Sequence, residues 1–348
     1  MRIGVYALAK NELKHVPYWA DSCADADVRV VTDTGSTDGT DAALVDEGVT
    51  VARGSVVPWR WDDAHNLSLY HLPADLDVCV RLDLDERLQP GWRQAIERAW
   101  TGDVNNLHYR YVWSWQSSGE PGVAFTSDRV HARHGFRWAS PTHEGLTCWA
   151  GQRVIAHADG LEIHHYRDPG KKHVTDLTLL EVAIRETPND ARAHWYYARE
   201  LDYAGRDESA DAFRRYLDLP GGSATERAYA CRVLYRRTGD EHWAHRSVTQ
   251  CSDEPDGWLL LALIRHHQRQ WRDSLAFAVR ACECTQSSHA TDPLARARAA
   301  DLASVASWEL GLRRQALTLG ERAASQLPDD ERIQSNVRVM AQLLAGAA

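Results

Sequence analysis

Two carboxylates, Asp83 and Asp85, follow the apolar-leaning run 77–82 and stand two positions apart. On an extended backbone residues i and i+2 point the same way, so both side chains are expected to face one site at a strand's end. Two hard oxygen ligands suit a divalent cation such as Mn²⁺ or Mg²⁺ that carries a diphosphate. A single D-x-D is more often a solvated strand end, so its weight depends on the neighbouring motifs.

The elements that would position these acids alternate between strand and helix. They are a strand over 3–9, a polar turn over 10–12, a strand over 28–32, a glycine-rich turn over 33–40, a helix over 40–47 and a strand over 49–53. This order is typical of βαβ units. Ligands of open α/β sheets lie at the carboxyl ends of the strands, so Asp33 is a candidate nucleotide contact. Ser36 and Thr37 are expected to cap the following helix.

Residues 106–156 are rich in aromatic side chains at strand-like spacing, and 160–167 has the pattern of a last strand. Some of these aromatic side chains are expected in the core. Others could form a stacking wall for a sugar or another flat acceptor, and the spacing alone does not separate the two groups.

From 171 to 340 the pattern is almost entirely that of amphipathic helices, with a long helix starting at 171–173. Gly205, Gly239 and Gly311 each lie in a polar break between two helical segments. The positions of Ala and Pro in 311–328 match the second helix of a tetratricopeptide repeat, and we expect about four helical hairpins in a solenoid-like domain. An irregular helical bundle is the alternative.

The bulk composition bounds the class of protein. The chain of 348 residues is long enough for two domains, and no apolar run approaches the length that spans a bilayer, so no membrane insertion is expected. The start reads directly as a strand without room for a signal peptide, and the seven cysteines form no C-x-x-C pair, which favours a cytoplasmic protein with reduced thiols. The net charge of −9 argues against a surface coated for nucleic acid.

Three motifs together resemble those of family-2, GT-A-fold nucleotide-sugar glycosyltransferases. They are Lys-Asn-Glu at 10–12, Asp-Thr-Gly-Ser-Thr-Asp-Gly-Thr at 33–40 and Leu-Asp-Leu-Asp-Glu at 82–86. The resemblance covers residues 1 to about 175. It implies an α/β fold class, with a GT-A domain (a Rossmann-like mixed sheet) over 1–170 followed by an all-α, tetratricopeptide-like domain over 171–348. At His65 the chain departs from the family, which carries an arginine in the corresponding aromatic-Asp-x-x-Arg-Asn segment.

The resemblance also implies roles for particular residues. Asp85 is the direct metal ligand, Asp83 contacts the donor ribose or the metal through water, and His165 is the third ligand, with His164 as its rival because neighbours on a strand face opposite ways. Glu144 is the base that takes the acceptor's proton, with Asp128 and Glu120 behind it. The expected donor-binding residues are Ala9, Glu12, Asp33, Asn66 and Asp83. The histidines His131, His134 and His157 are interpreted as ordinary core or surface residues.

The function expected from these features is metal-dependent, inverting glycosyl transfer with Mn²⁺ or Mg²⁺. The donor is a nucleotide sugar, first of all a UDP-sugar, and the acceptor is a peptide or protein, a glycan, or a hydroxymethylated DNA base. The alternative is a catalytically weak interaction module that recruits partners through its helices. A sugar-phosphate nucleotidyltransferase ranks lower, because residues 7–12 lack the Gly-rich, basic loop of that class. The helical domain is a candidate surface for homodimerisation.

Overall fold

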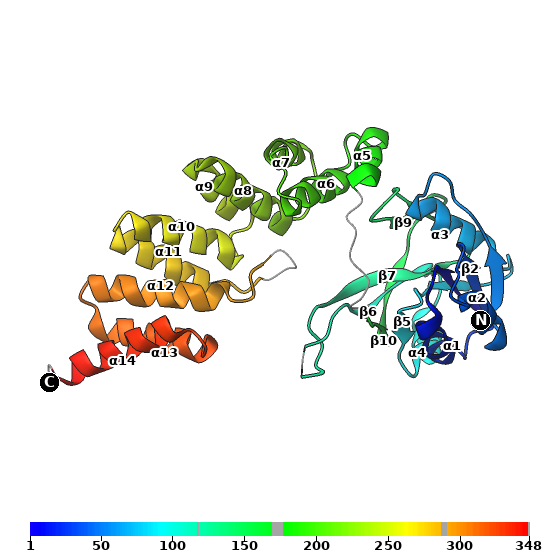
Figure 1. The fold of residues 1–348 in the computed structure, drawn as a ribbon, viewed down its shortest axis with the longest axis horizontal. Helices are drawn as coiled ribbons and strands as arrows, with labels where there is room; N and C mark the ends of the chain where they lie inside the picture. The colour runs from blue at the N-terminus through cyan, green and yellow to red at the C-terminus, as the bar shows by residue number, and fades with distance from the viewer. Residues whose placement is uncertain (117, 169–176, 287–290, 347–348) are drawn as a thin grey trace. The chain divides into compact units, whose positions relative to one another are not determined.

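The structure, a computed structural model, describes residues 1–116, 118–168, 177–286 and 291–346. The chain divides into two compact units, Met1–Glu186 and Thr187–Ala348 (Figure 1). The domain boundary predicted between 170 and 171, and the helix start predicted at 171–173, lie outside the described residues.

An eight-stranded sheet forms the centre of the first unit. Its strands are β1 (Ile3–Ala9), β2 (Val28–Asp33), β3 (Thr50–Arg53), β4 (Val78–Arg81), β5 (Glu86–Leu88), β6 (Asn106–Val112), β7 (Ala124–Ala132) and β10 (Ile155–His165). In space they follow the order β3-β2-β1-β4-β7-β6-β10-β5. The first four pair in parallel, whereas β7 lies antiparallel between β4 and β6, and β5 lies antiparallel to β10. The sheet is therefore mixed, as predicted.

The first unit also contains helices. They are η1 (Leu13–His15), α1 (Val16–Ser22), α2 (Thr40–Asp46), α3 (Trp61–Tyr70), α4 (Trp92–Ala99) and α5 (Leu177–Glu186). Helix α3 begins at Trp61, directly after the extended residue Arg60.

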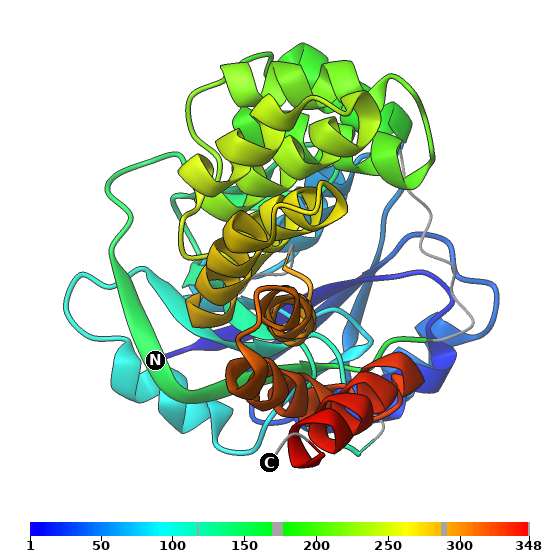
Figure 2. The ribbon, with the colours of Figure 1, turned by 90° about the vertical axis from the view of Figure 1, so that its left-hand side faces the viewer.

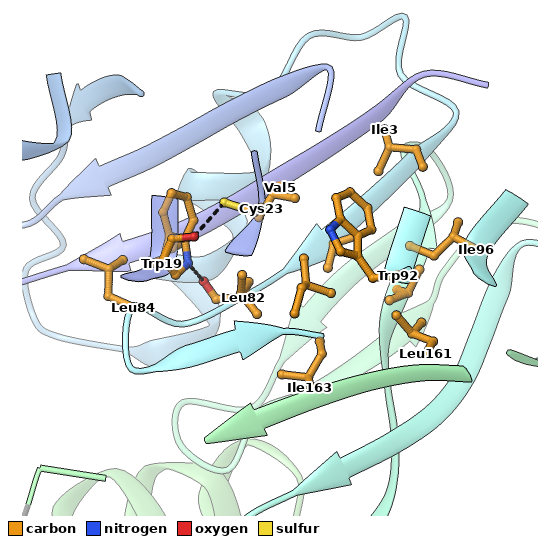
Figure 3. Close-up of a cluster of buried hydrophobic side chains, with 14 of the residues drawn as sticks. Ile3, Val5, Trp19, Cys23, Leu82, Leu84, Trp92, Ile96, Leu161 and Ile163 are labelled. Carbon is orange, nitrogen blue, oxygen red and sulfur yellow. Dashed lines mark hydrogen bonds between the residues drawn. The ribbon is translucent and has the colours of Figure 1, made fainter. Parts of the chain in front are cut away.

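The main core packs α1 and α4 against the sheet, and it fixes the end of β4 (Figure 3). Trp19 is fully buried, and its indole N–H donates a hydrogen bond of 2.9 Å to the carbonyl of Leu82. Leu82 and Leu84 are buried in the same cluster. Burying two leucines contributes roughly 3–6 kcal/mol, so the turn that carries Asp83 and Asp85 is anchored by the apolar residues between and before them.

A two-stranded sheet of β8 (Phe136–Ala139) and β9 (Gly145–Cys148) lies beside α3. Asn66 of α3 bonds both backbone groups of Trp138, donating to its carbonyl and accepting from its N–H, each at 2.9 Å. Ser140 and His143, in the loop between the strands, both have positive φ (88° and 50°), which is uncommon for residues other than glycine. This constrained loop ends at Glu144.

The second unit consists of helices in consecutive antiparallel pairs (Figure 2). They are α6 (Ala191–Tyr203), α7 (Ser209–Asp218), α8 (Ala224–Thr238), α9 (Glu241–Gln250), α10 (Pro255–His267), α11 (Trp271–Glu283), α12 (Ala295–Glu309), α13 (Arg313–Gln326) and α14 (Glu331–Ala345). Gly205, Gly239 and Gly311 lie in the turns within three of the pairs, with φ of 69°, 71° and 78°. Arg269 takes the same left-handed conformation between α10 and α11. The hairpin breaks predicted at the three glycines are confirmed.

The fold class is the predicted one, an α/β unit with a mixed sheet followed by an all-α unit of helical hairpins. Within the described part of the chain, no helix combines the length and apolar character needed to cross a membrane.

Candidate functional site

The D-x-D motif lies in a turn and not on a strand. Strand β4 ends at Arg81, Leu84 and Asp85 form a turn, and β5 starts at Glu86. The expectation that Asp83 and Asp85 face the same side of an extended strand is therefore wrong. Because the backbone turns between them, the two carboxylates contact different partners.

Asp85 meets His165 of β10. The Nε2 atom of His165 lies 3.3 Å from Oδ2 of Asp85, and its Nδ1 lies 3.0 Å from the carbonyl oxygen of Trp113. A carbonyl can only accept, so Nδ1 carries a proton and the lone pair of a neutral His165 points at Asp85. Burial lowers the pKa of His165, but its contacts with Asp85 and Trp113 outweigh this and raise that pKa. A protonated His165 can donate to Asp85 across this distance.

The rival histidine faces elsewhere. His164 bonds Glu162 through Nε2 at 2.9 Å and packs edge-on against Trp115. In the part of the chain that the structure describes, no group of three or more His, Cys, Asp or Glu side chains is arranged to hold a metal ion. The predicted set of three ligands, Asp83, Asp85 and His165, is therefore not assembled among the described residues, and only Asp85 and His165 face each other.

Asp83 is held between two arginines. Arg81 approaches both of its oxygens, at 3.3 and 3.2 Å, and Arg129 of β7 approaches Oδ2 at 3.3 Å. Burial raises the pKa of Asp83, but the charges of Arg81 and Arg129 outweigh it and hold that pKa well below its ordinary value. Arg129 also donates to the buried Glu86 at 2.7 Å. Asp83 is therefore ionised and fixed in place.

Glu144 contacts the other side of Arg81. Its Oε1 accepts a hydrogen bond of 2.7 Å from the guanidinium and lies 3.3 Å from Nε2 of His65. Burial raises the pKa of Glu144, but Arg81 and His65 overcome this and lower it to about 2. Burial, together with the charge of Arg81, lowers the pKa of His65, so its ring is neutral near pH 7. Both neighbours approach Oε1, so Oε2 keeps capacity for another donor.

A buried hydrogen-bonded chain of side chains packs against Arg81 of this cluster. The guanidinium of Arg81 lies 4.5 Å above the ring of Trp138, whose indole N–H donates to the hydroxyl oxygen of Tyr6 at 2.8 Å. The Tyr6 hydroxyl lies 2.9 Å from Nε2 of His131, and Nδ1 of His131 lies 2.8 Å from the carbonyl of Ala132. The carbonyl of Ala132 fixes the His131 tautomer with its proton on Nδ1. Each side-chain donor and acceptor in this hydrogen-bonded chain therefore has a partner.

The buried His131 of this hydrogen-bonded chain makes the stability of the fold depend on pH. Burial lowers the pKa of His131 to about 4, whereas an unfolded histidine titrates near 6.5, so only the unfolded state gains this proton between those values. The His131 contribution to the free energy of unfolding should fall by about 2 kcal/mol from pH 7 to pH 5. Urea unfolding of the wild type and His131→Gln at both pH values measures it. The variant should be less stable at pH 7 but lose about 2 kcal/mol less on acidification; equal losses would contradict the expectation.

The expected donor-binding residues lie at the carboxyl ends of β1 and β2. The carbonyl of Ala9 accepts from the N–H of Thr34 at 2.9 Å, and the backbone N–H of Glu12 donates to the Thr40 hydroxyl at 2.8 Å. Asp33 accepts from the backbone N–H groups of Gly35 and Ser36 and so closes its own turn. Their roles in nucleotide binding stay predictions. The side-chain amide of Asn66 is hydrogen-bonded to the backbone of Trp138, as described above.

The alternative bases lie away from the acid cluster. Asp128 and Arg129 are consecutive on β7, so their side chains leave opposite faces of the sheet. Asp128 pairs with Arg153. Glu120 is exposed. Of the acids proposed for proton transfer, only Glu144 contacts the residues that hold Asp83.

Sequence reasoning missed the arginines that organise the site. Arg81 lies two positions before Asp83 of the D-x-D motif, so its position was a usable signal. Arg129 is found only from the register of β4 and β7, in which Val80 pairs with Val130 and the next residues along, Arg81 and Arg129, come together. Glu86, the partner of Arg129, belongs to the sequence motif at 82–86, but the sequence alone assigned it no role.

Known proteins resemble the chain only in fold. No protein-family model matches the sequence, and no curated protein matches it. Glucosyl-3-phosphoglycerate synthase from Mycobacterium tuberculosis, solved with Mn²⁺, UDP-glucose and phosphoglyceric acid, is 24% identical over 32% of this chain and 43% of its own, with a TM-score of 0.28. The chain thus spans less than half the length of that enzyme.

Helical-repeat proteins also resemble the chain. They include the APC/C heterotetramer Cut9–Hcn1 (10% identity, 49% of this chain, 33% of that chain, TM-score 0.38) and the TPR protein YrrB (15%, 47%, 81%, 0.36). The first region is therefore similar in fold to a GT-A-type glycosyltransferase, and the chain also resembles TPR proteins. At these TM-scores the likenesses carry no argument about activity.

Proposed function

We propose that this chain is a metal-dependent, inverting glycosyltransferase that moves a sugar from a nucleotide-diphosphate donor to an acceptor. The observation that carries the proposal is the opposed pair of Asp85 and His165. Their facing atoms are 3.3 Å apart. Adjacent ligands of an octahedral ion with bonds of roughly 2.1 Å stand roughly 3 Å apart, so the pair fits one such cation.

The ligand set has the chemistry of a Mn²⁺ or Mg²⁺ site. Asp85 supplies a hard oxygen and His165 a nitrogen, and the N–H of His165 on Trp113 is the kind of support that metal-bound histidines have. A bound ion would neutralise the charge that develops on the leaving diphosphate. Asp83, ionised and held by Arg81 and Arg129, is proposed to accept hydrogen bonds from the donor ribose.

Glu144 is the proposed base for the acceptor hydroxyl, through Oε2. Arg81 keeps it ionised over the whole physiological range but also weakens it as a base, because the pKa is about 2. Its expected contribution to the rate therefore lies at the low end for positioned bases. UDP-sugars remain the first donors to test.

The deciding experiment is a panel of nucleotide sugars with Mn²⁺, scored for slow donor hydrolysis, which requires no acceptor. Chelator should abolish turnover, and added Mn²⁺ or Mg²⁺ should restore it, because Asp85 and His165 alone cannot neutralise a leaving diphosphate. Undiminished turnover in well-exchanged chelator would exclude the metal site. Failure to bind or turn over any nucleotide sugar would leave the catalytically weak interaction module as the better reading.

A further inference from the structure

A cleft of about 930 Å³ opens between α1 and the segment 87–92, which leads from β5 into α4. Its lining includes Lys14 and Tyr18 from the η1–α1 segment, Arg87 and Gln89 from the segment after β5, and Tyr166 after β10. None of these residues has a part in the acid cluster around Asp83. The volume is in the range of small-molecule sites.

Arg87, which lines this cleft, is a partly buried cation without a carboxylate partner. It donates to the carbonyl oxygens of Leu84 at 2.7 Å and Glu86 at 2.6 Å, and more weakly to His15 at 3.3 Å. Among residues 1–116, 118–168, 177–286 and 291–346, no carboxylate lies within ion-pair distance of it; Asp85 acts on it only from further away.

The other cations nearby are compensated. Lys14 pairs with Asp168 at 2.5 Å, and Arg81 and Arg129 have the carboxylates of Asp83, Glu144 and Glu86. A partly buried cation that donates only to neutral acceptors gains most from an anion, and charge-assisted hydrogen bonds are about twice as strong as neutral ones. Arg87 is therefore the place in the cleft for a negative group.

Two tyrosines stand beside this cation. The guanidinium carbon of Arg87 is 5.6 Å from the ring centre of Tyr18 and 5.9 Å from that of Tyr166. These side chains are 67% and 43% exposed. One face of Tyr166 stacks on Trp115, so Tyr18 is the more open of the two rings. Asp21 and Asp25 also line the cleft, and their charges disfavour a long polyanion. The lining suits a small molecule with one anionic group and a flat or apolar body.

The cleft is adjacent to the proposed metal site but separate from it. Glu86 and Arg87 are consecutive on β5, so their side chains leave opposite faces, Glu86 toward Tyr111 and Arg129. The backbone N–H of Tyr166 donates to the carbonyl of Asp85 at 2.8 Å. A ligand in the cleft would thus lie next to the turn that carries Asp85.

We propose that this cleft is a second ligand site, which binds the phosphate or carboxylate group of a small molecule on Arg87 and its body against Tyr18 and Tyr166. This site is separate from that of the sugar acceptor, because Glu144, the proposed acceptor base, belongs to the cluster around Arg81 and Asp83.

Calorimetric titration of the full chain with phenyl phosphate, inorganic phosphate and phenol tests the site. Phenyl phosphate should bind best and phenol not at all at millimolar concentrations. Arg87→Gln should weaken phenyl phosphate about tenfold or more, because a hydrogen bond to a charged group is lost. Tyr18→Ala should weaken phenyl phosphate about threefold but leave inorganic phosphate unchanged, because only stacking is lost. Arg98→Gln, an exposed arginine on α4, is the matched control.

Arg87 also bonds three carbonyl groups, so thermal melting must accompany the titrations. If Arg87→Gln does not fold, two other variants test the site. Arg87→Lys keeps the charge and should still bind inorganic phosphate, and Tyr18→Ala should lose affinity for phenyl phosphate alone. Binding that is absent in the wild type, or indifferent to both the Arg87 and Tyr18 changes, overturns the proposal.

A parallel titration with UDP and Mn²⁺ separates two sources of the anion. Arg87→Gln should leave UDP affinity within about twofold, because the nucleotide is expected at the carboxyl ends of β1 and β2. An equal loss of UDP and phenyl phosphate affinity would mean that Arg87 holds the donor's own diphosphate, and the second site would be refuted. Arg87-dependent binding of phenyl phosphate in a protein that binds no nucleotide would instead support the cleft and remove the proposed function.

Discussion

Asp85→Asn should lower the rate of donor turnover by about 10³-fold, ~4 kcal/mol in barrier, because the change removes a charged ligand from the proposed metal site. Asparagine keeps the size and one oxygen, and the buried leucines on either side of the turn are untouched, so the fold should survive. The affinity for UDP with Mn²⁺ should fall together with the rate. Titration of Mn²⁺ in the presence of UDP measures both.

Two further measurements separate a metal ligand from a surface acid. Asp46→Asn, an exposed position on α2, should leave turnover unchanged. The pKa of His165 is raised in part by Asp85, so it should fall in Asp85→Asn, which NMR titration of the metal-free protein detects. Turnover close to wild type in Asp85→Asn would show that Asp85 is not part of the metal site. An unchanged pKa of His165 in this variant would contradict the contact between His165 and Asp85.

Glu144→Gln should lower the transfer rate by about 10²-fold, ~3 kcal/mol in barrier, while the affinity for UDP with Mn²⁺ stays within a few fold. Glutamine can still accept the hydrogen bond from Arg81, but it cannot take a proton. The estimate is at the low end of the range for positioned bases because Arg81 holds the pKa of Glu144 at about 2. Single-turnover kinetics with saturating donor measures the transfer step alone.

The comparison variant is Asp128→Asn, on the opposite face of β7. It should transfer sugar at the wild-type rate, although it loses the ion pair with Arg153. If Glu144→Gln transfers at the wild-type rate, the base is another group. If it loses nucleotide binding as severely as Asp85→Asn, Glu144 belongs to the donor site, and its pairing with Arg81 has a purely positioning role.

The regular part of the fold was predictable because it is local. The alternation in 3–9 and the β-branched run from Val28 define β1 and β2, and glycines mark three hairpin turns of the helical unit. The hairpin between α10 and α11 has no such mark, because Arg269 adopts the left-handed conformation there. Such a position has no sequence signal, since arginine in that conformation is rare.

The contacts of the site were not predictable, because they depend on pairings between distant strands. The turn at Leu84 and Asp85 separates two carboxylates that the spacing alone places together. Arg129 lies 46 positions from Asp83 in the chain and meets it only through the register of β4 and β7. Likewise, the choice between His164 and His165 needs the pairing of β10 with β5.

That pairing has a consequence for the length of the chain. In the ladder of β5 and β10, His165 is opposite Glu86 and His164 is opposite Arg87. A shift by one residue turns every side chain of a strand to the other face, so it would replace His165 by His164 beside Asp85. The register irregularity between His157 and Glu162 is the place in β10 that absorbs extra residues. An odd number of residues inserted or deleted between that irregularity and His165 turns the histidine to the other face, and two residues move it by roughly 6.6 Å along the strand, so relatives that retain the Asp85 partner should keep this length unchanged.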